Sequence, residues 1–217
     1  MACFKHLLGD ICHPVLESKR LLGKHRCMQE EAIRDGMSRQ RALLSPEVVH
    51  DASALVMRRV KQLEEFCEAE LVAAYVGIRG EIDPWPILEA VEIRIALPVV
   101  RPGGVLEFVL PSGPLQPGPF GIRQPVSGER VSLRDLDVVL VPVVVADKRC
   151  NRMGHGAGYY DRTFAFRLEA PAPPLLIGIA HSFQVVPSLN AQSWDVPLDI
   201  LATEQGILLR KPQIGED

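Results

Sequence analysis

Short apolar segments with few interrupting polar residues recur along the chain and predict buried β-strands. Residues 71–76 read LVAAYV and residues 138–144 read VVLVPVV. Continuous apolar segments of this length are typical of strands that are covered on both faces, as in a parallel sheet. We expect further strands at 97–100, 105–110 and 175–180.

Other segments predict helices, at 28–44, 46–66, 83–95 and 159–168. In the first three of these, apolar residues repeat at intervals of three and four, which is typical of an amphipathic helix. The second segment has a strong start signal, because Ser45 can cap it, Pro46 suits the first turn and Glu47 favours the positive end of the helix dipole.

Strands that alternate with helices predict an α/β fold, a three-layer sandwich with a mainly parallel central sheet flanked by helices. No repeat or low-complexity linker divides the sequence, so we expect a single domain over residues 28–210. Residues 1–27 would form an N-terminal extension, and residues 211–217 a C-terminal tail. One interpretation of the extension is that it is poorly ordered.

Composition narrows the class of partner. The 217 residues carry a formal net charge of −3, so no strong overall field favours nucleic acid or an anionic membrane. The five cysteines are far apart and lack the spacing of a zinc site, which indicates reduced thiols. We therefore expect a cytoplasmic monomer that binds small molecules and neither nucleic acid nor membrane.

A glycine-rich segment follows the strand predicted at 138–144 and precedes the helix predicted at 159–168. Gly154, Gly156 and Gly158 can adopt positive φ and direct successive amides into one concavity, which suits a phosphate group. Arg152 could bind phosphate oxygens and Asp161 could hold Mg²⁺. Taken alone, three spaced glycines favour a tight turn over a nucleotide site.

The surrounding residues strengthen the second interpretation. Residues 142–161 read PVVVADKRCNRMGHGAGYYD. This segment resembles the hallmark of the 5-formyltetrahydrofolate cyclo-ligase family, approximately P-G-x-x-F-D-x-x-G-x-R-L-G-x-G-x-G-Y-Y-D. The matching positions are Pro142, Asp147, Arg152, Gly154, Gly156, Gly158, Tyr159, Tyr160 and Asp161. Further agreement occurs at 41–47, 75–83, 97–98, 120–125, 135–142 and 194–199.

The resemblance implies an enzyme that uses ATP and Mg²⁺ to convert 5-formyltetrahydrofolate to 5,10-methenyltetrahydrofolate, releasing ADP and phosphate. In the family's proposed route, the formyl oxygen accepts the γ-phosphoryl group and a neighbouring folate nitrogen then closes the ring. Phosphoryl transfer of this kind depends on positioning and charge neutralisation.

The resemblance also implies site residues. ATP would contact Arg34, Arg152, Met153, Gly154, His155, Gly156, Ala157, Gly158, Tyr159 and Tyr160, with Arg152 and Tyr160 catalytic. The folate would contact Tyr75, Val76, Glu81, Phe120 and Tyr159, and Mg²⁺ would be held by Asp161 and Asp199. We expect the His155 side chain to face solvent, His181 to be structural and Asp195 to cap a turn.

Two departures from the family pattern leave alternatives open. Glu30 stands four residues before Arg34, where the family usually has a lysine or arginine, and Cys150 replaces a glycine. A cysteine at positive φ would be strained by about 1 kcal/mol. A related enzyme with altered turnover and a non-catalytic nucleotide- or folate-binding module therefore remain alternatives. A dinucleotide oxidoreductase is disfavoured, because the glycine loop comes late in the chain.

Overall fold

A single mixed sheet forms the centre of the molecule. The computed structural model describes residues 13–89, 92–101, 104–170 and 172–211, with side chains from residue 28 onward except that of Phe120. The sheet contains β1 (Leu71–Ala73), β2 (Arg94–Val100), β3 (Leu106–Pro111), β6 (Gly128–Val131), β7 (Val138–Pro142), β10 (Leu175–Ile179), β12 (Ile200–Ala202) and β13 (Ile207–Leu209). Their order across the sheet is β13-β12-β10-β7-β1-β2-β3-β6.

The sheet is parallel in the middle and antiparallel at both edges. Strands β12, β10, β7, β1 and β2 pair in parallel. The pairs β12–β13, β2–β3 and β3–β6 are antiparallel. The predicted mainly parallel sheet is confirmed, and its carboxyl ends lie together at one edge, which is where α/β folds place ligands.

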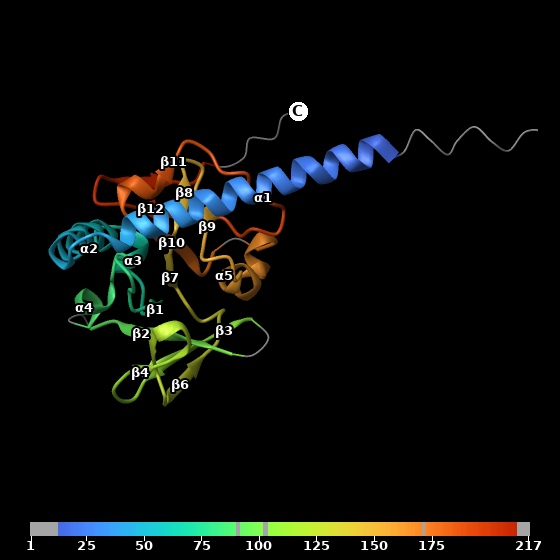
Figure 1. Ribbon diagram of the computed structural model, residues 1–217. Coiled ribbons are helices and arrows are strands. Elements are labelled where there is room, and N and C mark those ends of the chain that lie inside the picture. The colour runs from blue at the N-terminus through green and yellow to red at the C-terminus, as the bar shows by residue number, and fades with distance from the viewer. Residues whose placement is uncertain (1–12, 90–91, 102–103, 171, 212–217) are drawn as a thin grey trace, which may run out of the picture.

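Helices lie on both faces of this sheet (Figure 1). The α-helices are α1 (His13–Ala42), α2 (Pro46–Val60), α3 (Glu64–Cys67), α4 (Trp85–Leu88) and α5 (Tyr159–Thr163). The 3-10 helices are η1 (Pro119–Gly121), η2 (Ala165–Leu168) and η3 (Ser182–Gln184). In Figure 1, α1 lies across the molecule and its first turns project beyond the other elements.

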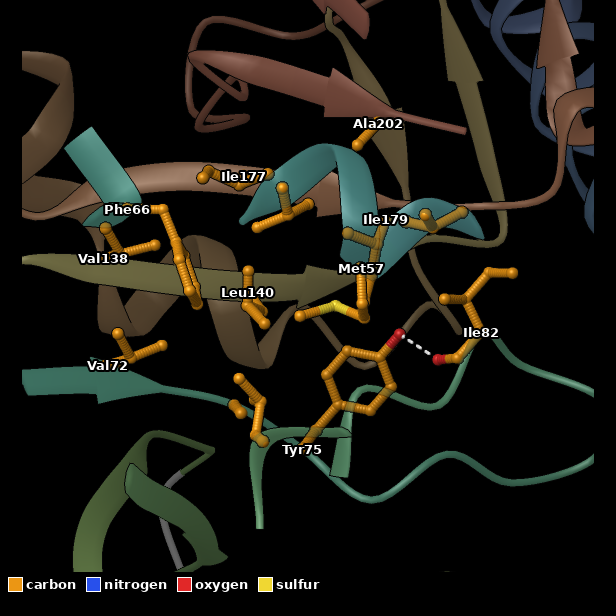
Figure 2. Packing of buried hydrophobic residues seen from close by; sticks show 14 of the residues in the cluster. Met57, Phe66, Val72, Tyr75, Ile82, Val138, Leu140, Ile177, Ile179 and Ala202 are labelled. Carbon is orange, nitrogen blue, oxygen red and sulfur yellow. Dashed lines mark hydrogen bonds between the residues drawn. The ribbon is translucent and has the colours of Figure 1, made fainter. Parts of the chain in front are cut away.

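Alternate residues of each strand pack into two separate cores. Met57 of α2 and Phe66 of α3 pack with Val72, Leu140 and Ile177 on one face of the sheet (Figure 2). The other face packs Leu71, Val139 and Val141 against Phe164, which follows α5, and against Leu198. This alternation is the two-residue period of strands buried on both sides, and it confirms the three-layer sandwich.

Two smaller sheets lie beside the central one. A three-stranded sheet has the order β11-β8-β9, and a two-stranded sheet pairs β4 with β5. Their bounds are β4 (Gln116–Pro117), β5 (Arg123–Gln124), β8 (Val145–Asp147), β9 (Arg152–Met153) and β11 (Val185–Val186). Strand β8 follows β7 directly, and β9 leads into the glycine-rich segment.

The start of α2 agrees with the sequence signal. The Ser45 side chain accepts a hydrogen bond from the amide of Val48, and Pro46 begins the helix. The helix ends at Val60, earlier than expected, and Phe66 belongs to the separate helix α3. The apolar spacing continued across the break, so periodicity alone did not locate it.

The helix expected at 83–95 is largely wrong. Of the described residues in this range, only Trp85–Leu88 form a helix, α4, and the chain is already in β2 from Arg94. Ile95 and Leu97 are buried in β2, so the apolar spacing that indicated a helix reflects burial in the sheet. The helix expected at 159–168 is also interrupted, because α5 ends at Thr163 and η2 begins at Ala165.

The first helix begins earlier than expected. It starts at His13, so residues 13–27, which the sequence assigned to an extension, continue a helix of the main fold. Residues 1–12 and 212–217 lie outside the described residues. The expectation that the N-terminal extension is poorly ordered is therefore not tested for residues 1–12. In the part of the chain that the structure describes, no helix is long and apolar enough to cross a membrane.

The packing of the first core predicts that truncation of a buried side chain lowers the free energy of unfolding substantially. Leu140→Ala removes a side chain with no exposed surface from the centre of the sheet. The expected loss in the free energy of unfolding is about 2–5 kcal/mol, measured by urea denaturation. Leu43→Ala, at a residue that is 86% exposed, is the matched control and should change stability by about 0.5 kcal/mol or less. Equal effects of the two substitutions would contradict this packing.

Candidate active site

A cavity of about 1130 Å³ opens beside the carboxyl ends of β1 and β7. Its wall includes Glu30 and Arg34 from α1, Pro98 from β2 and Pro142 from β7, together with the whole segment 151–162. This volume is at the upper end for a small-molecule site and is sufficient for two ligands side by side.

The cavity brings together most of the residues that the sequence singled out. The predicted site residues that lie in its wall are Arg34, Tyr75, Val76, Glu81, Arg152, Met153, Gly154, His155, Gly156, Ala157, Gly158, Tyr159, Tyr160 and Asp161. Asp199 is absent from the wall, and the side chain of Phe120 lies outside the described part of the chain. Candidates separated by more than 100 residues in sequence thus share one surface.

The glycine loop, residues 154–158, connects β9 to α5. Gly156 has φ of 92° and Gly158 has φ of 63°, whereas Gly154 does not have the positive φ that was expected of all three. Positive φ at two alternating positions turns the chain and exposes backbone amides, as in an anion-binding nest. Since α5 has only five residues, the binding capacity lies in the loop amides rather than in a helix dipole.

Arg162 fixes the shape of this loop, and the sequence analysis did not assign it a role. Its Nη2 donates to the carbonyl of Ala157, and its Nε donates to the carbonyl of Gly104 at 2.8 Å. A Cβ at Gly158 would lie 2.9 Å from Nη1 of Arg162, and the positive φ of Gly158 favours glycine there. The available signal was the position of Arg162, immediately after Asp161 in the family motif.

Two guanidinium groups lie on the same side of the cavity as the loop. Arg152 donates from Nη2 to Oδ1 of Asp161 at 2.8 Å. Arg34 approaches Gly156 so closely that a Cβ built there would lie 3.3 Å from its Nη1. The Nε of Arg34 is buried and has no hydrogen-bond partner among the described residues. A buried donor without a partner is costly, and an anionic ligand would remove that cost.

The structure does not bring Asp199 together with Asp161. Asp199 immediately precedes β12, at the amino end of the strand, and it accepts the Leu176 amide at 2.8 Å. Its two oxygens also accept from Nη2 of Arg167, at 2.7 and 3.0 Å. The expected metal ligand is therefore corrected to a structural partner of a buried arginine.

Asp161 remains as a candidate metal ligand. Its Oδ1 accepts from Arg152 and from the Val196 amide, at 2.8 and 3.1 Å. No cluster of three or more His, Cys, Asp or Glu side chains among the described residues could hold a metal ion. A single carboxylate is still compatible with Mg²⁺, which commonly binds one or two carboxylates together with substrate phosphates and water.

A buried ion pair supports another part of the cavity wall, at Glu81. Nη2 of Arg41 lies 3.1 Å from Oε1 of Glu81, and the two side chains are 2% and 6% exposed. Arg41 also donates to the carbonyls of Val143 and Arg79, at 3.2 and 3.4 Å. The sequence analysis placed Arg41 in a segment that agrees with the family but assigned it no role, since an arginine in an amphipathic helix gives no signal of a partner 40 residues away.

The loop that carries Glu81 is held by glycines and by Asp83. Oδ1 of Asp83 accepts from the amides of Gly77 and Trp85, at 2.9 and 3.2 Å, and burial raises the pKa of this carboxyl group. Gly80 has φ of 76°, and a Cβ there would lie 2.3 Å from the carbonyl oxygen of Arg41. The loop can therefore pack directly on the end of α1.

His155 is exposed, as expected, but its side chain also contacts the protein. Its Nε2 lies 3.0 Å from Oε1 of Glu81, although half of the His155 side chain is exposed. His155 therefore joins the glycine loop to the carboxylate of Glu81. This contact spans 74 positions in the sequence, which explains why local reasoning did not find it.

Two tyrosines in the wall remain neutral. The Tyr75 hydroxyl donates to the carbonyl of Ile82 at 2.7 Å (Figure 2), and desolvation by burial raises its pKa well above the ordinary value. Burial also raises the pKa of Tyr160, whose ring stacks on Phe164 with centroids 6.2 Å apart. Tyr160 can therefore donate a hydrogen bond but is unsuited to act as a base.

Three further residues have structural positions. His181 is buried, its Nε2 lies 2.9 Å from the carbonyl of Gly80, and burial lowers its pKa. Asp195 accepts from the Gln192 amide at 2.8 Å, which closes the expected turn. Cys150 has φ of 64° and is fully buried, and burial raises its pKa to about 11. It is an unreactive thiol in a strained turn rather than a nucleophile.

An α/β fold with a cavity that joins a cationic glycine loop to a buried carboxylate and apolar walls is typical of an enzyme that acts on small molecules. The model of the 5-formyltetrahydrofolate cyclo-ligase family matches residues 26–204. The chain belongs to this family and is a ligase. The resemblance noted from the sequence is thereby confirmed.

Individual relatives agree with this assignment. The 5-formyltetrahydrofolate cyclo-ligase of Haemophilus influenzae is 32% identical over 183 residues, which cover 80% of this chain and 97% of the relative. That of Escherichia coli K12 is 31% identical over 173 residues, covering 76% and 94%.

Solved structures are also similar. The 5,10-methenyltetrahydrofolate synthetase of Aquifex aeolicus matches with a TM-score of 0.72 and 34% identity, over 86% of this chain and 95% of the other. The synthetase of Mycoplasma pneumoniae has a TM-score of 0.64 at 24% identity, over 80% and 98%, and supports the fold.

The buried ion pair predicts that Glu81 contributes to folding as well as to the cavity. Glu81→Ala leaves the Arg41 guanidinium buried without its carboxylate, and should lower the free energy of unfolding by about 3–5 kcal/mol. Glu107→Ala is the matched control, because Glu107 pairs with Arg101 at 2.9 Å but is 34% exposed. That exposed pair should contribute about 1 kcal/mol or less. Urea denaturation that finds the two losses equal would refute the role of the buried pair.

Proposed function

We propose that this protein catalyses the ATP-dependent conversion of 5-formyltetrahydrofolate to 5,10-methenyltetrahydrofolate, with release of ADP and phosphate. The observation that carries the proposal is the cavity itself. Its wall combines a glycine loop with Arg34 and Arg152 and the buried carboxylate of Glu81. The unpartnered Nε of Arg34 supports an anionic ligand beside the glycine loop.

The reaction explains why such a cavity suffices without a protein nucleophile. A formamide carbon is a poor electrophile, because its oxygen is a poor leaving group. Transfer of the γ-phosphoryl group to the formyl oxygen makes that oxygen part of a phosphate. The neighbouring folate nitrogen then forms a bond to the formyl carbon, the carbon–oxygen bond breaks, and phosphate leaves. The enzyme must align the two substrates and neutralise the charge that moves between them.

The residues on the glycine-loop side supply this alignment and charge. The amides of residues 154–158 would bind phosphate oxygens, and Arg34 and Arg152 would neutralise them. The neutral hydroxyl of Tyr160, and that of Tyr159, could add hydrogen bonds. Asp161 is the residue that would hold Mg²⁺, which when bound neutralises phosphate charge, and Asp199 is not proposed for this task.

The part of the wall around Glu81 would bind the folate. The edge of a pterin carries several N–H donors, and a carboxylate such as Glu81 can only accept, so the two are complementary. Tyr75 and Val76 provide apolar surface beside Glu81, and Phe120 is proposed as a further contact from its position in the family pattern. Arg41 would orient Glu81 through their ion pair.

One observation favours a second candidate, a nucleotide- or folate-binding protein of the same family with reduced turnover. Glu30 lines the cavity one helical turn before Arg34. A carboxylate at this position repels a triphosphate, and the repulsion weakens ATP binding. The tests below separate the two candidates.

The direct test is absorbance at the methenyltetrahydrofolate band after protein, Mg-ATP and 5-formyltetrahydrofolate are mixed. The band should grow only when ATP is present, with ADP and phosphate formed in equal amounts. Arg152→Ala should reduce the rate by about 10²-fold or more, because it removes a charge aimed at the transferring group. Tight folate binding without growth of the band would favour the second candidate.

The position of Glu30 predicts that reversal of its charge strengthens ATP binding. Glu30→Lys should lower the apparent KM for ATP by on the order of tenfold, since it removes a repulsion and adds an attraction at a half-buried position. Glu31→Lys is the matched control, because Glu31 is exposed on the same helix and is not part of the cavity wall. If both variants give the same KM, Glu30 lies too far from the phosphates to affect them.

A further inference from the structure

Among the described residues, His155 links the glycine loop to Glu81 through its side chain. It lies between Gly154 and Gly156, and its Nε2 is 3.0 Å from Oε1 of Glu81. Because Glu81 is ion-paired with Arg41 and a carboxylate accepts only, Nε2 of His155 is the donor. A residue in a loop that binds phosphate is thus held by a group on the folate side.

The acceptor capacity of Glu81 limits how many donors can bind at once. Oε1 already accepts from Nη2 of Arg41 at 3.1 Å and from His155, and Oε2 accepts from the Ile78 amide at 3.2 Å. Each carboxylate oxygen has about two lone-pair sites. Oε1 is therefore saturated, and a ligand with paired N–H donors can engage both oxygens only if one protein donor leaves.

The three donors differ in how easily they can leave. Arg41 is 2% exposed and also donates to two backbone carbonyls. The Ile78 amide belongs to the loop that carries Glu81 itself. His155 is 50% exposed and is attached to a loop with glycine on both sides of it. His155 is the donor that can leave at the lowest cost in free energy.

We propose that His155 is a positioning residue that occupies the acceptor site on Glu81 which a reduced folate needs, so that folate binding displaces it and frees the glycine loop. This inference rests on the function proposed above. His155 would thereby set the affinity for folate, and would couple occupation of the folate side to the position of the loop that receives the phosphates.

The test measures the dissociation constant of 5-formyltetrahydrofolate by calorimetry, without nucleotide, for the full-length protein. His155→Ala removes the competing donor, and the water that replaces it is displaced more easily. Binding should therefore tighten about three- to tenfold. His155→Gln retains an N–H donor of similar reach and should stay within about twofold of the unmodified protein.

Two controls separate this role from a general structural one. His50→Ala, at an exposed position on α2 away from the cavity, should leave folate affinity unchanged. The melting temperatures of the variants should stay close to that of the unmodified protein, because His155 is half exposed. Tighter binding by His155→Ala alone, with Gln restoring the original affinity, supports the proposal.

The contrary outcomes are distinct. If the unmodified protein binds folate and His155→Ala binds it equally or more weakly, His155 does not compete for Glu81 and this inference is wrong, while the proposed function stands. If neither protein binds 5-formyltetrahydrofolate at millimolar concentration, the proposed function fails and this inference fails with it.

Discussion

The buried ion pair between Arg41 and Glu81 is the interaction on which the geometry of the cavity depends. Arg41 lies in the last turn of α1 and binds the loop that follows β1 as well as the carbonyl of Val143, just after β7. Gly80 lets that loop lie against the carbonyl oxygen of Arg41. One arginine therefore joins three segments that are distant in sequence, and it fixes Glu81 in a place where no charge would otherwise be stable.

The cavity separates charge in a way that suits its two proposed ligands. Arg34, Arg152 and the loop amides give one side a positive potential, and Glu81 gives the other an acceptor. Asp161 is paired with Arg152, which orients the guanidinium and keeps one carboxylate close to the cationic side. This distribution of charge is what the proposed function requires, with a polyanion near the arginines and a donor-rich heterocycle near Glu81.

Sequence reasoning succeeded where the signal was local. Apolar segments located the central strands, Ser45 and Pro46 located the start of α2, and the order of residues in 142–161 identified the family. It failed where helical and strand periods gave the same short apolar pattern, as before β2. It also failed for contacts between distant positions, because nothing in the neighbourhood of Arg41 or His155 indicates Glu81, and nothing near Asp199 indicates Arg167.

The central claim is that the glycine loop and its two arginines bind a triphosphate. Calorimetric titration with the magnesium complex of a non-hydrolysable ATP analogue tests it most directly. The account predicts saturable binding by the unmodified protein and an affinity at least about tenfold lower for Arg34→Ala, at an unchanged melting temperature. Absence of binding at millimolar nucleotide, or equal affinity of the two proteins, would contradict it.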